Sequence, residues 1–321
     1  MNNTYKDGGV PEDVVKTVNW YIDNLNTLKV TDPIYIPSKG NRPKAITHLL
    51  EEFGDAEVYV FCYKEEYEEK GYDKLKLGPN CHIVQIEVPW RSLQQKRVWI
   101  QEWSRKRGVK RYFMMDDDLS IKSKIANISR EGPAKLDIKL PQLFAIMQHY
   151  FKDRDFSIAS TSIDTAVAFC SKLETQGSCY CMFYVNDELL QSKGISWDPD
   201  PAQAEDMIMN YTCFKNNIPG TSLMFMCYQS FYKNDFKNSV ASKIDNYKRF
   251  IVKTWINCKG FYVPAYDSKN DRVKFRQNKK DNHEAKFNEI YAQVGNSYDK
   301  LLEYVKKQNQ KTEIKPFWSE K

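Results

Sequence analysis

Short strand patterns alternate with helix patterns over the first 120 residues, and this alternation limits the possible folds more than any other feature. Helix patterns at about 43–53 and 92–107 separate runs rich in β-branched and aromatic residues at 33–37, 57–63, 82–88 and 112–115. Trp99 and Trp103 lie one turn apart and predict a stripe that packs on the core. The alternation predicts an α/β fold with a mostly parallel central sheet flanked by helices.

Three aspartates follow the fourth strand pattern directly. Asp116, Asp117 and Asp118 come after the apolar residues 112–115, and open α/β sheets bind ligands at such strand ends. Adjacent carboxylates repel one another, and burial adds to the cost. A bound Mg²⁺ or Mn²⁺ removes both problems, because these ions prefer oxygen ligands and bridge them to phosphates. The motif therefore predicts a metal and diphosphate site, or else an acidic loop or helix N-terminus.

Two further segments carry residues suited to the same kind of site. The first strand pattern ends at Pro37 and continues into the polar turn Ser38-Lys-Gly-Asn-Arg42, ahead of a helix pattern. Strand, glycine-containing turn and helix is how open sheets present phosphate-binding loops. About 90 residues beyond the aspartates, a turn-rich stretch leads into a helix pattern whose first turns carry Glu205 and Asp206.

The pattern is less regular after Asp118. We expect residues 121–137 to be polar and irregular and residues 172–178 to form a loop. Residues 269–280 are basic without an apolar period, which predicts a mobile loop ahead of one final helix over 284–307. The remaining predicted elements are strands at 156–160, 179–185 and 223–231, helices at 12–28, 140–151, 202–215 and 240–255, and an extended stretch at 261–264.

Positive charge is concentrated in the last quarter of the chain. Residues 237–321 hold 19 Lys and Arg against 10 Asp and Glu, whereas the first 236 residues have a net charge of −3. We therefore expect a catalytic core over 1–236 and a basic, mainly helical C-terminal region over 237–321. The basic region favours a polyanionic partner such as nucleic acid, although a solvated lysine-rich surface has the same composition.

Composition restricts the class of protein. A hydrophobic fraction of 41% suits a globular protein with a core, and no apolar run reaches the roughly 18 residues that span a bilayer. The polar start lacks a signal-peptide pattern, so we expect a cytoplasmic protein, in a host cytoplasm if viral, with no membrane partner. Eight cysteines are expected to be reduced thiols, and Cys179 and Cys181 lack a second pair at zinc spacing.

The order of these motifs resembles that of glycosyltransferases with the GT-A fold. The turn at 38–42, the aspartates at 116–118 and the Glu205–Asp206 pair carry the resemblance, which extends from about residue 31 to 285. It implies a first-strand loop that holds a nucleotide and an Asp-x-Asp motif that holds the metal and diphosphate of a nucleotide-sugar. It also implies an acidic motif that faces the acceptor.

A closer resemblance is carried by Ile34-Tyr-Ile-Pro-Ser-Lys-Gly-Asn-Arg-Pro43 together with Lys110-Arg-Tyr-Phe-Met-Met-Asp-Asp-Asp118. These segments are similar to the phage-type and TET/JBP-associated DNA glycosyltransferases. The resemblance implies transfer of a sugar from a nucleoside-diphosphate sugar, such as a UDP-sugar, to a hydroxymethylated pyrimidine in phage DNA. A pentose such as arabinose and glucose both remain open as the sugar, and cytosine and uracil as the parent base. No obligate protein partner is evident.

The resemblance also implies a metal site with Mn²⁺ or Mg²⁺. Asp118 is the expected metal ligand, with Asp116 as its partner directly or through water. Asp117 is expected to face the ribose or the sugar of the donor. Enzymes of this fold often take a third ligand from a histidine near the C-terminus, and His283 stands in that place. An ordinary surface histidine beside a basic loop is the alternative for His283.

The nucleotide-sugar is expected to contact a small set of residues. A guanidinium suits diphosphate oxygens because it can donate two parallel hydrogen bonds. Arg97, on the helix before the aspartates, matches the donor-contacting arginine of many related enzymes, and Lys96 or Arg91 could fill the same role. The first-strand candidates for nucleotide or phosphate contacts are Pro37, Ser38 and Arg42.

The acceptor side has candidates for catalysis and for DNA binding. Asp206 is the expected general base, because a hydroxymethyl group becomes a good nucleophile only when its proton is removed during attack. Glu205 and Asp200 are alternatives, and Glu205 and Asp206 also suit a helix N-terminus without any role in catalysis. Attack opposite the leaving group would invert the anomeric centre, although a similar fold also serves retaining enzymes. The expected phosphate contacts are Lys269, Arg272, Lys274, Arg276, Lys279 and Lys280.

Three other functions fit parts of this sequence. A GT-A glycosyltransferase with a glycan or protein acceptor would share the donor site but would not bind DNA in a salt-dependent way. A metal-dependent nuclease or nucleotidyltransferase could use the same carboxylates, but it would leave the turn at 38–42 unexplained. A non-enzymatic nucleic-acid-binding protein would not need the clustered aspartates.

Overall fold

The structure is a computed structural model of the 321-residue chain. It describes residues 10–38, 46, 50, 53, 55–88, 92–117, 119–128, 135–163, 172–177, 179–200, 204–230, 244–277 and 282–313. The chain forms two compact units. The first, called the sheet unit below, comprises Met1–Pro199 and Thr212–Lys233. The second, called the C-terminal unit, comprises Asp200–Tyr211 and Asn234–Lys321.

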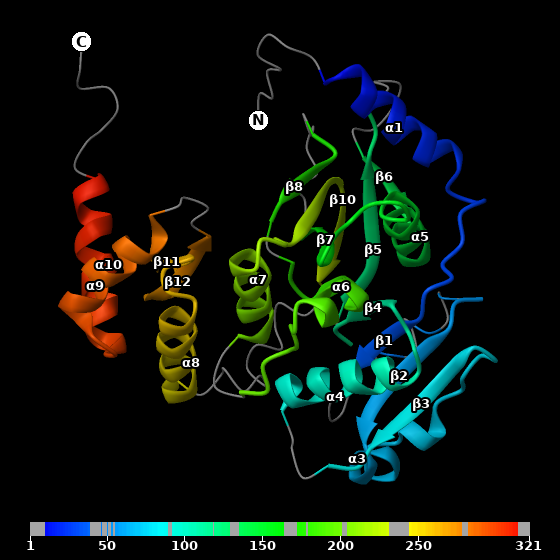
Figure 1. Cartoon of the computed structure of the whole chain (residues 1–321), viewed down its shortest axis with the longest axis horizontal. Helices are drawn as coiled ribbons and strands as arrows, with labels where there is room; N and C mark the ends of the chain where they lie inside the picture. The colour runs from blue at the N-terminus through cyan, green and yellow to red at the C-terminus, as the bar shows by residue number, and fades with distance from the viewer. Residues whose placement is uncertain are drawn as a thin grey trace. The chain divides into compact units, whose positions relative to one another are not determined.

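In the described part of the sheet unit, ten strands form one mixed sheet (Figure 1). The first strands pair in parallel in the order β3-β2-β1-β4, as the alternation of strands and helices predicts. The path continues as β9-β7-β10-β5-β6, with β8 paired to β10. The α/β class and the large central sheet flanked by helices are thus confirmed. The strand bounds are β1 Ile34–Pro37, β2 Val58–Tyr63, β3 Cys81–Ile86, β4 Arg111–Met115, β5 Leu119–Ala126, β6 Lys135–Ile138, β7 Ile158–Ile163, β8 Glu174–Gln176, β9 Met182–Asn186 and β10 Thr221–Ser230.

Strand β4 lies at the centre of this sheet and of its core. It pairs in parallel with β1 and antiparallel with β9, so hydrogen-bonded neighbours occupy both of its edges. The ring of Phe113 stacks on Phe144 at 4.5 Å and on Tyr184 at 4.3 Å between ring centroids. Residues 112–115 are fully buried. The polar residues that follow β4 are therefore carried by one of the most constrained strands of the fold.

Helices cover the sheet, and their bounds are α1 Glu12–Asp23, α3 Lys64–Glu69, the 3₁₀ turn η1 Tyr72–Lys74, α4 Leu93–Lys106, α5 Leu140–Tyr150 and α6 Asp187–Ser192. Trp99 and Trp103 of α4 pack edge-on against Phe61, and Trp103 also packs on Tyr35, as the aromatic stripe predicts. Ile46, Leu50 and Phe53 are helical and buried. They belong to the helix expected at 43–53, and the rest of that helix lies outside the described residues.

Buried polar side chains distinguish α4 from the other helices of the unit. Its buried positions include Lys96, Arg97, Gln101 and Ser104, beside a single aliphatic residue, Ile100. Buried polar groups require partners, so this face of α4 has to meet specific hydrogen-bonding groups rather than an apolar core.

Several elements differ from the sequence-based expectation. Residues 119–126 and 135–138 form β5 and β6 instead of an irregular stretch, since Ser123 and Ile125 turn inward while Lys122 and Lys124 alternate with them. Residues 174–176 form β8, a short strand on β10, in place of a loop. Their polar composition hid the period of two in both places.

The C-terminal unit combines helices with a β-hairpin (Figure 1). Its elements are α8 Ile244–Asn257, β11 Tyr262–Asp267, β12 Arg272–Gln277, α9 His283–Val294 and α10 Tyr298–Glu313. Helix α7 (Glu205–Lys215) starts in this unit and ends in the sheet unit. The expected loop at 269–280 thus contains a strand, and the single final helix is two helices separated at Gly295, whose φ of +56° favours glycine.

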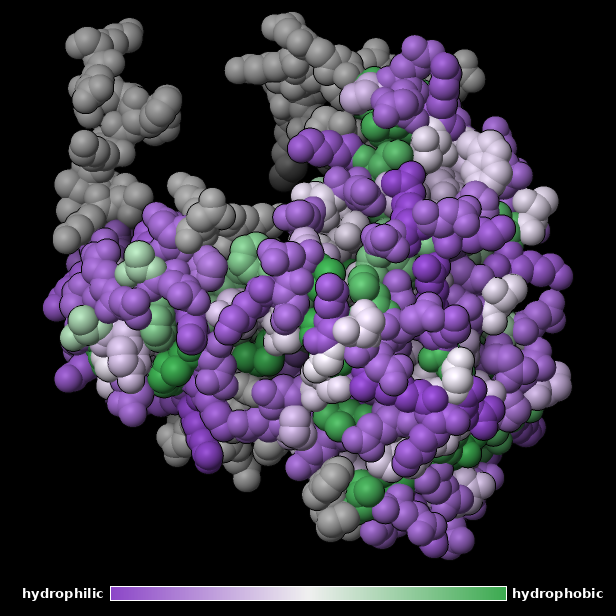
Figure 2. All heavy atoms as spheres, in the orientation of Figure 1, coloured by the Kyte–Doolittle hydropathy of each residue, from purple (hydrophilic) through white to green (hydrophobic). Residues whose placement is uncertain are grey.

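The face of the molecule drawn in Figure 2 is mostly hydrophilic. Figure 2 shows hydrophilic residues over most of the visible face, with hydrophobic side chains scattered among them. None of the helices in the described residues has both the length and the apolarity needed to cross a membrane.

Candidate functional site

Two aspartates follow β4 at the edge where β1 also ends. The backbone N–H of Asp116 donates to the carbonyl of Cys181 at 2.8 Å, which extends the β4–β9 pairing by one residue. The side chain of Asp116 is 22% exposed, whereas Asp117 is only 3% exposed. The carboxylate of Asp116 is therefore partly accessible to solvent, whereas that of Asp117 is buried. Asp118 lies outside the described residues.

Asp117 is held by a chain of buried hydroxyl groups. Ser38 Oγ donates to Asp117 Oδ2 at 2.8 Å and lies 2.7 Å from the hydroxyl of Tyr72. Because the single hydroxyl proton of Ser38 goes to the carboxylate, Tyr72 is the donor to Ser38. Burial raises the pKa of Tyr72 well above its usual value, so this hydroxyl keeps its proton. Ser38 and Asp117 were both predicted to contact the nucleotide-sugar, and the fold brings them together. Tyr72 completes this hydrogen-bonded group.

Arg97 forms an ion pair with Asp116. Its Nη2 donates to Asp116 Oδ1 at 2.7 Å, and the arginine side chain is almost completely buried. The carbon of the guanidinium group lies over two aromatic rings that contact each other edge-on, 4.9 Å from the centroid of Phe183 and 5.0 Å from that of Trp197. A planar, weakly hydrated cation suits such stacking. The predicted donor-contacting arginine therefore meets one of the predicted metal-binding aspartates.

Lys96 brings a second buried cation to the same edge. Its Nζ donates to the carbonyl oxygen of Ser38 and lies 3.4 Å from that of Phe61. The ammonium also lies 4.2 Å from the centroid of the Tyr63 ring. A lysine with 2% exposure is rare without a specific role. Arg91 and Arg42, the other predicted cations here, lie outside the described residues.

Glu205 and Asp206 open α7 within the C-terminal unit. Glu205 is buried, whereas Asp206 is partly exposed. Asp206 Oδ1 accepts from the N–H of Met207 at 2.7 Å, and the start of the helix is fixed by Ala204 N–H, which donates to Thr254 Oγ1 at 3.0 Å. The alternative carboxylate, Asp200, forms an ion pair with Lys253. Asp206 is thus a partly accessible carboxylate on a fixed helix end.

His283 begins α9 and lies edge-on to the rings of Tyr211 and Phe261. Within the described residues, no group of three or more His, Cys, Asp or Glu side chains gathers where it could hold a metal ion. The predicted ligand role of His283 stays a prediction, as does the set that includes Asp118.

The chain passes very close to the first turn of α9 at Gly260. This residue has a φ of +80°, and a Cβ atom there would lie 2.4 Å from the carbonyl oxygen of His283 and 2.7 Å from Cβ of Phe287. We expect Gly260→Ala to destabilise the C-terminal unit by about 3 kcal/mol, through backbone strain plus a clash with backbone atoms. Chemical denaturation measures the loss. Gly295→Ala is the control, since it also has a positive φ but meets nothing within 4 Å; an equal loss in both would contradict the close approach.

The predicted DNA contacts lie on a β-hairpin. In β12, Val273 is buried and Phe275 partly so, while Lys274 and Arg276 are exposed on the other face. Arg272 forms an ion pair with Asp267 across the hairpin. Lys269 is exposed in the turn, and Lys279 and Lys280 lie outside the described residues.

Sequence reasoning missed part of the site because the partners are distant along the chain. Tyr72 follows a short helix and carries no motif, and Phe183 looks like an ordinary core residue of β9. The only usable signal lay in α4, where two cations and Gln101 occupy positions that a helix on a sheet would normally fill with apolar residues.

A comparison with protein-family models agrees with this geometry. The model described as TET-Associated Glycosyltransferase matches residues 32–210, which is more than half of the chain. The matched region includes Ser38, Arg97, Asp116 and Asp117 as well as Asp206. A comparison with curated proteins gives no match. The chain therefore belongs to the TET-associated glycosyltransferase family, and the protein is a glycosyltransferase.

Proposed function

We propose that this protein transfers a sugar from a nucleoside-diphosphate sugar, such as a UDP-sugar, to the hydroxyl of a 5-hydroxymethylpyrimidine in DNA, with inversion at the anomeric carbon. The observation that carries the proposal is the gathering of Ser38, Lys96, Arg97, Asp116 and Asp117 at one sheet edge, inside the region that matches the family. The association with TET in the family's name favours a modified DNA base as acceptor.

Charge and burial support this edge as the donor site. A nucleotide-sugar brings a diphosphate that must be neutralised, and Lys96 and Arg97 supply two cations within a few residues of the ends of β1 and β4. Asp116 is the carboxylate with exposed surface, so it can face a ligand, while buried Asp117 is fixed by Ser38. Ligands of open α/β sheets bind at this end of the strands.

The side chains of Asp116 and Asp118 fit a hard divalent cation, because carboxylate oxygens are the ligands that Mn²⁺ and Mg²⁺ prefer. We propose that these two aspartates hold the ion, while the ligand role of His283, which belongs to the C-terminal unit, stays a prediction. Such an ion, when bound, would neutralise the charge that develops on the departing diphosphate. Arg97 fixes the side chain of Asp116 through their ion pair.

Asp206 is proposed as the general base. The hydroxymethyl oxygen forms a bond to the anomeric carbon while the bond from that carbon to the diphosphate oxygen breaks, and the hydroxyl proton passes to the carboxylate of Asp206. The nucleoside diphosphate leaves on the opposite face of the sugar, which produces inversion. Partial exposure supports Asp206 over its buried neighbour Glu205.

The hairpin β11–β12 is proposed as a DNA contact. A two-stranded ribbon is narrow enough to enter the major groove. Lys274 and Arg276 project from the face opposite Val273, so both charges are available to phosphates. The ribbon then positions the polymer, while the target base must leave the stack to reach a catalytic carboxylate.

We expect the double charge reversal Lys274→Glu and Arg276→Glu to weaken DNA binding strongly. Loss of two phosphate contacts should lower the slope of log K against log salt by about 2. Fluorescence anisotropy with labelled duplex DNA at several salt concentrations measures both changes. The control reverses Lys286 and Lys300, exposed lysines in the same unit, with the same change in net charge. Equal effects in the two variants would argue against a specific ribbon contact.

A donor screen tests the proposed function directly. The protein is incubated with unmodified or hydroxymethylated DNA and with each nucleotide-sugar in turn, with and without Mn²⁺. The expected result is release of nucleoside diphosphate and a mass increase of the DNA by one sugar, only with hydroxymethylated DNA. Transfer to a glycan or a protein but not to DNA would overturn the acceptor, and no release under any condition would overturn the reaction.

A further inference from the structure

A short irregular segment, residues 195–197, runs along α4 in the sheet unit and is called the strap below. It has no regular secondary structure, yet Ile195 and Trp197 are buried almost completely. A segment without its own hydrogen-bond pattern needs outside partners when it is buried. Those partners come from α4.

Three side chains of α4 contact the strap, and they are spaced four residues apart on one face of the helix. Arg105 donates to the carbonyl of Ile195 and to Ser196 Oγ, both at 3.0 Å. Gln101 Oε1 accepts from the N–H of Trp197 at 3.0 Å. Arg97, the next along this face, stacks on the Trp197 ring. The strap is thus fixed at successive turns up to the proposed donor site.

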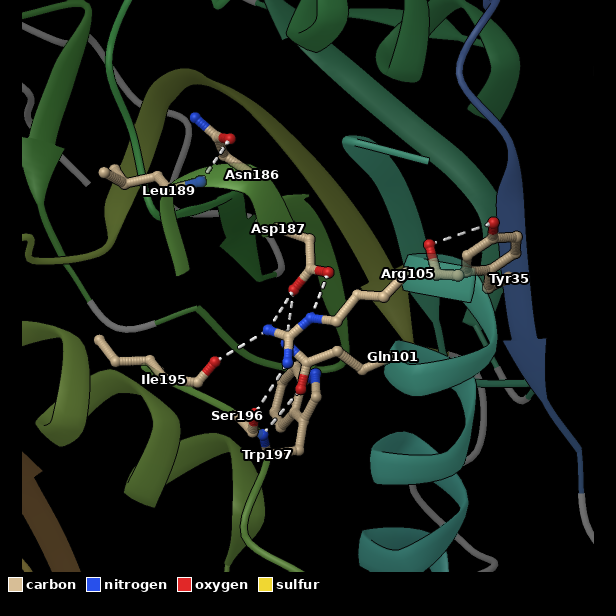
Figure 3. A network of polar contacts seen from close by, with 10 residues as sticks. Tyr35, Gln101, Arg105, Asn186, Asp187, Leu189, Ile195, Ser196 and Trp197 are labelled. Atoms are coloured by element: carbon tan, nitrogen blue, oxygen red, sulfur yellow. Dashed lines mark hydrogen bonds and ion pairs between the residues drawn. The ribbon is translucent and has the colours of Figure 1, made fainter. Parts of the chain in front are cut away.

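Asp187 sets the orientation of two of these side chains. Arg105 binds it through Nε at 2.8 Å and Nη2 at 2.9 Å, and Gln101 Nε2 donates to it at 2.6 Å. Figure 3 shows this carboxylate facing Arg105, with Ile195, Ser196 and Trp197 around the same guanidinium and amide groups. Since an ionised carboxylate only accepts, the amide nitrogen of Gln101 must point to Asp187, which leaves its oxygen for Trp197.

We propose that Asp187 is a positioning residue of the donor site, an inference that rests on the function proposed above. Asp187 orients Gln101 and Arg105, these hold the strap, and the strap holds the Trp197 ring against Arg97, which pairs with Asp116. Asp187 follows β9 at Asn186, which pairs with Arg111 at the start of β4, whereas Asp116 follows the end of β4. Asp187 therefore affects the donor site through α4 and the strap, and not through direct contact with Asp116.

The first test is local opening of the strap. In Asp187→Asn, an NH₂ group that cannot accept replaces one carboxylate oxygen, so either the bond from Arg105 Nε to Oδ2 or the two bonds from Arg105 Nη2 and Gln101 Nε2 to Oδ1 are lost. We expect hydrogen exchange of a peptide covering residues 194–199 to rise about tenfold, since at least one buried hydrogen bond to a charged group is lost. Exchange in β1 and β2 should not change. Faster exchange throughout the sheet unit, or unchanged exchange in the strap, would overturn the proposal.

The second test is kinetic. We expect kcat/KM for the donor to fall by about ten- to a hundredfold, because small misplacement of a catalytic group has effects of this size. The KM for the DNA acceptor should stay constant. Ser157→Ala is the matched control: Ser157 is equally buried in the same unit and donates to the carbonyl of Ile218 at 2.6 Å, away from the strap. A similar kinetic loss in this control would mean that destabilisation alone explains the effect.

A double-mutant cycle with Arg97→Lys shows whether Asp187 acts through Arg97. Lysine has no planar cation to stack on the rings of Phe183 and Trp197, so Asp187→Asn should lower kcat/KM little further in that background. Additive losses would overturn the proposed route. Arg105→Lys serves as a second variant if Asp187→Asn does not fold. It keeps the positive charge but loses the guanidinium nitrogens that donate to Ile195 and Ser196 of the strap. If the wild type transfers no sugar, the proposed function fails. Hydrogen exchange in the strap, together with the affinity of the wild type and of Asp187→Asn for UDP with Mn²⁺, then still decides whether Asp187 acts on this site.

Discussion

Asp116→Asn is expected to lower kcat/KM for sugar transfer by at least about a hundredfold, because it weakens the site for the ion that would neutralise charge on the departing diphosphate. The substitution keeps the shape of the side chain but removes the charge that pairs with Arg97 and that would bind a divalent ion. It should also destabilise the protein by about 2 kcal/mol, since it breaks a largely buried ion pair. Release of nucleoside diphosphate and thermal unfolding measure the two effects.

The double variant Arg97→Met with Asp116→Asn separates these effects. It replaces the buried cation with an apolar chain that packs on the rings of Phe183 and Trp197, so part of the stability should return while activity stays lost. Recovery of activity together with stability would mean that the ion pair serves the fold alone. Full activity in Asp116→Asn would remove this carboxylate from the proposed donor site.

Asp206→Asn is expected to reduce kcat by about 10² to 10⁴, the usual contribution of a general base. An asparagine oxygen can still accept from the N–H of Met207, so the start of α7 should be preserved. Affinity for the nucleotide-sugar should be unchanged, because the substitution leaves Asp116 and Arg97 of the proposed donor site as they are.

Glu205→Gln is the matched control for Asp206, since it changes the adjacent carboxylate by the same single atom. Its side chain is buried, so we expect an effect on stability and only a small effect on kcat. If Glu205→Gln lost more activity than Asp206→Asn, the assignment of the base would be reversed.

The donor edge could be predicted because its signals are local in sequence. The apolar run before Asp116 has the length of a buried strand, and a strand that ends in carboxylates indicates a ligand-binding edge wherever the sheet is open. The order of the strand and helix patterns was enough to bring Ser38 and Asp117 to the same edge. Their direct hydrogen bond follows from parallel pairing of β1 with β2 and β4.

The polar face of α4 could not be predicted in the same way. Gln101 and Arg105 resemble solvent-exposed residues, and their burial depends on Asp187, more than 80 residues later in the chain. Hydrophobic periodicity finds the face that packs on apolar neighbours, here Trp99 and Trp103, but it does not find a face buried by hydrogen bonds. The basic hairpin was missed for a related reason, because charge at every second residue of β12 concealed the alternation with Val273 and Phe275.

The division of the chain into units has a consequence for how such an enzyme can be rebuilt. The polypeptide passes from one unit to the other after Pro199, after Tyr211 and after Lys233, so the C-terminal unit is made of two separate segments. The family match ends at residue 210 and thus takes in nearly all of the shorter segment, with Asp206, but none of the longer one. A single cut therefore cannot isolate either unit intact. Exchanging residues 234–321 between relatives to change acceptor preference would require redesign of residues 200–211 at the same time, since Ala204 and Asp200 bind Thr254 and Lys253 of α8.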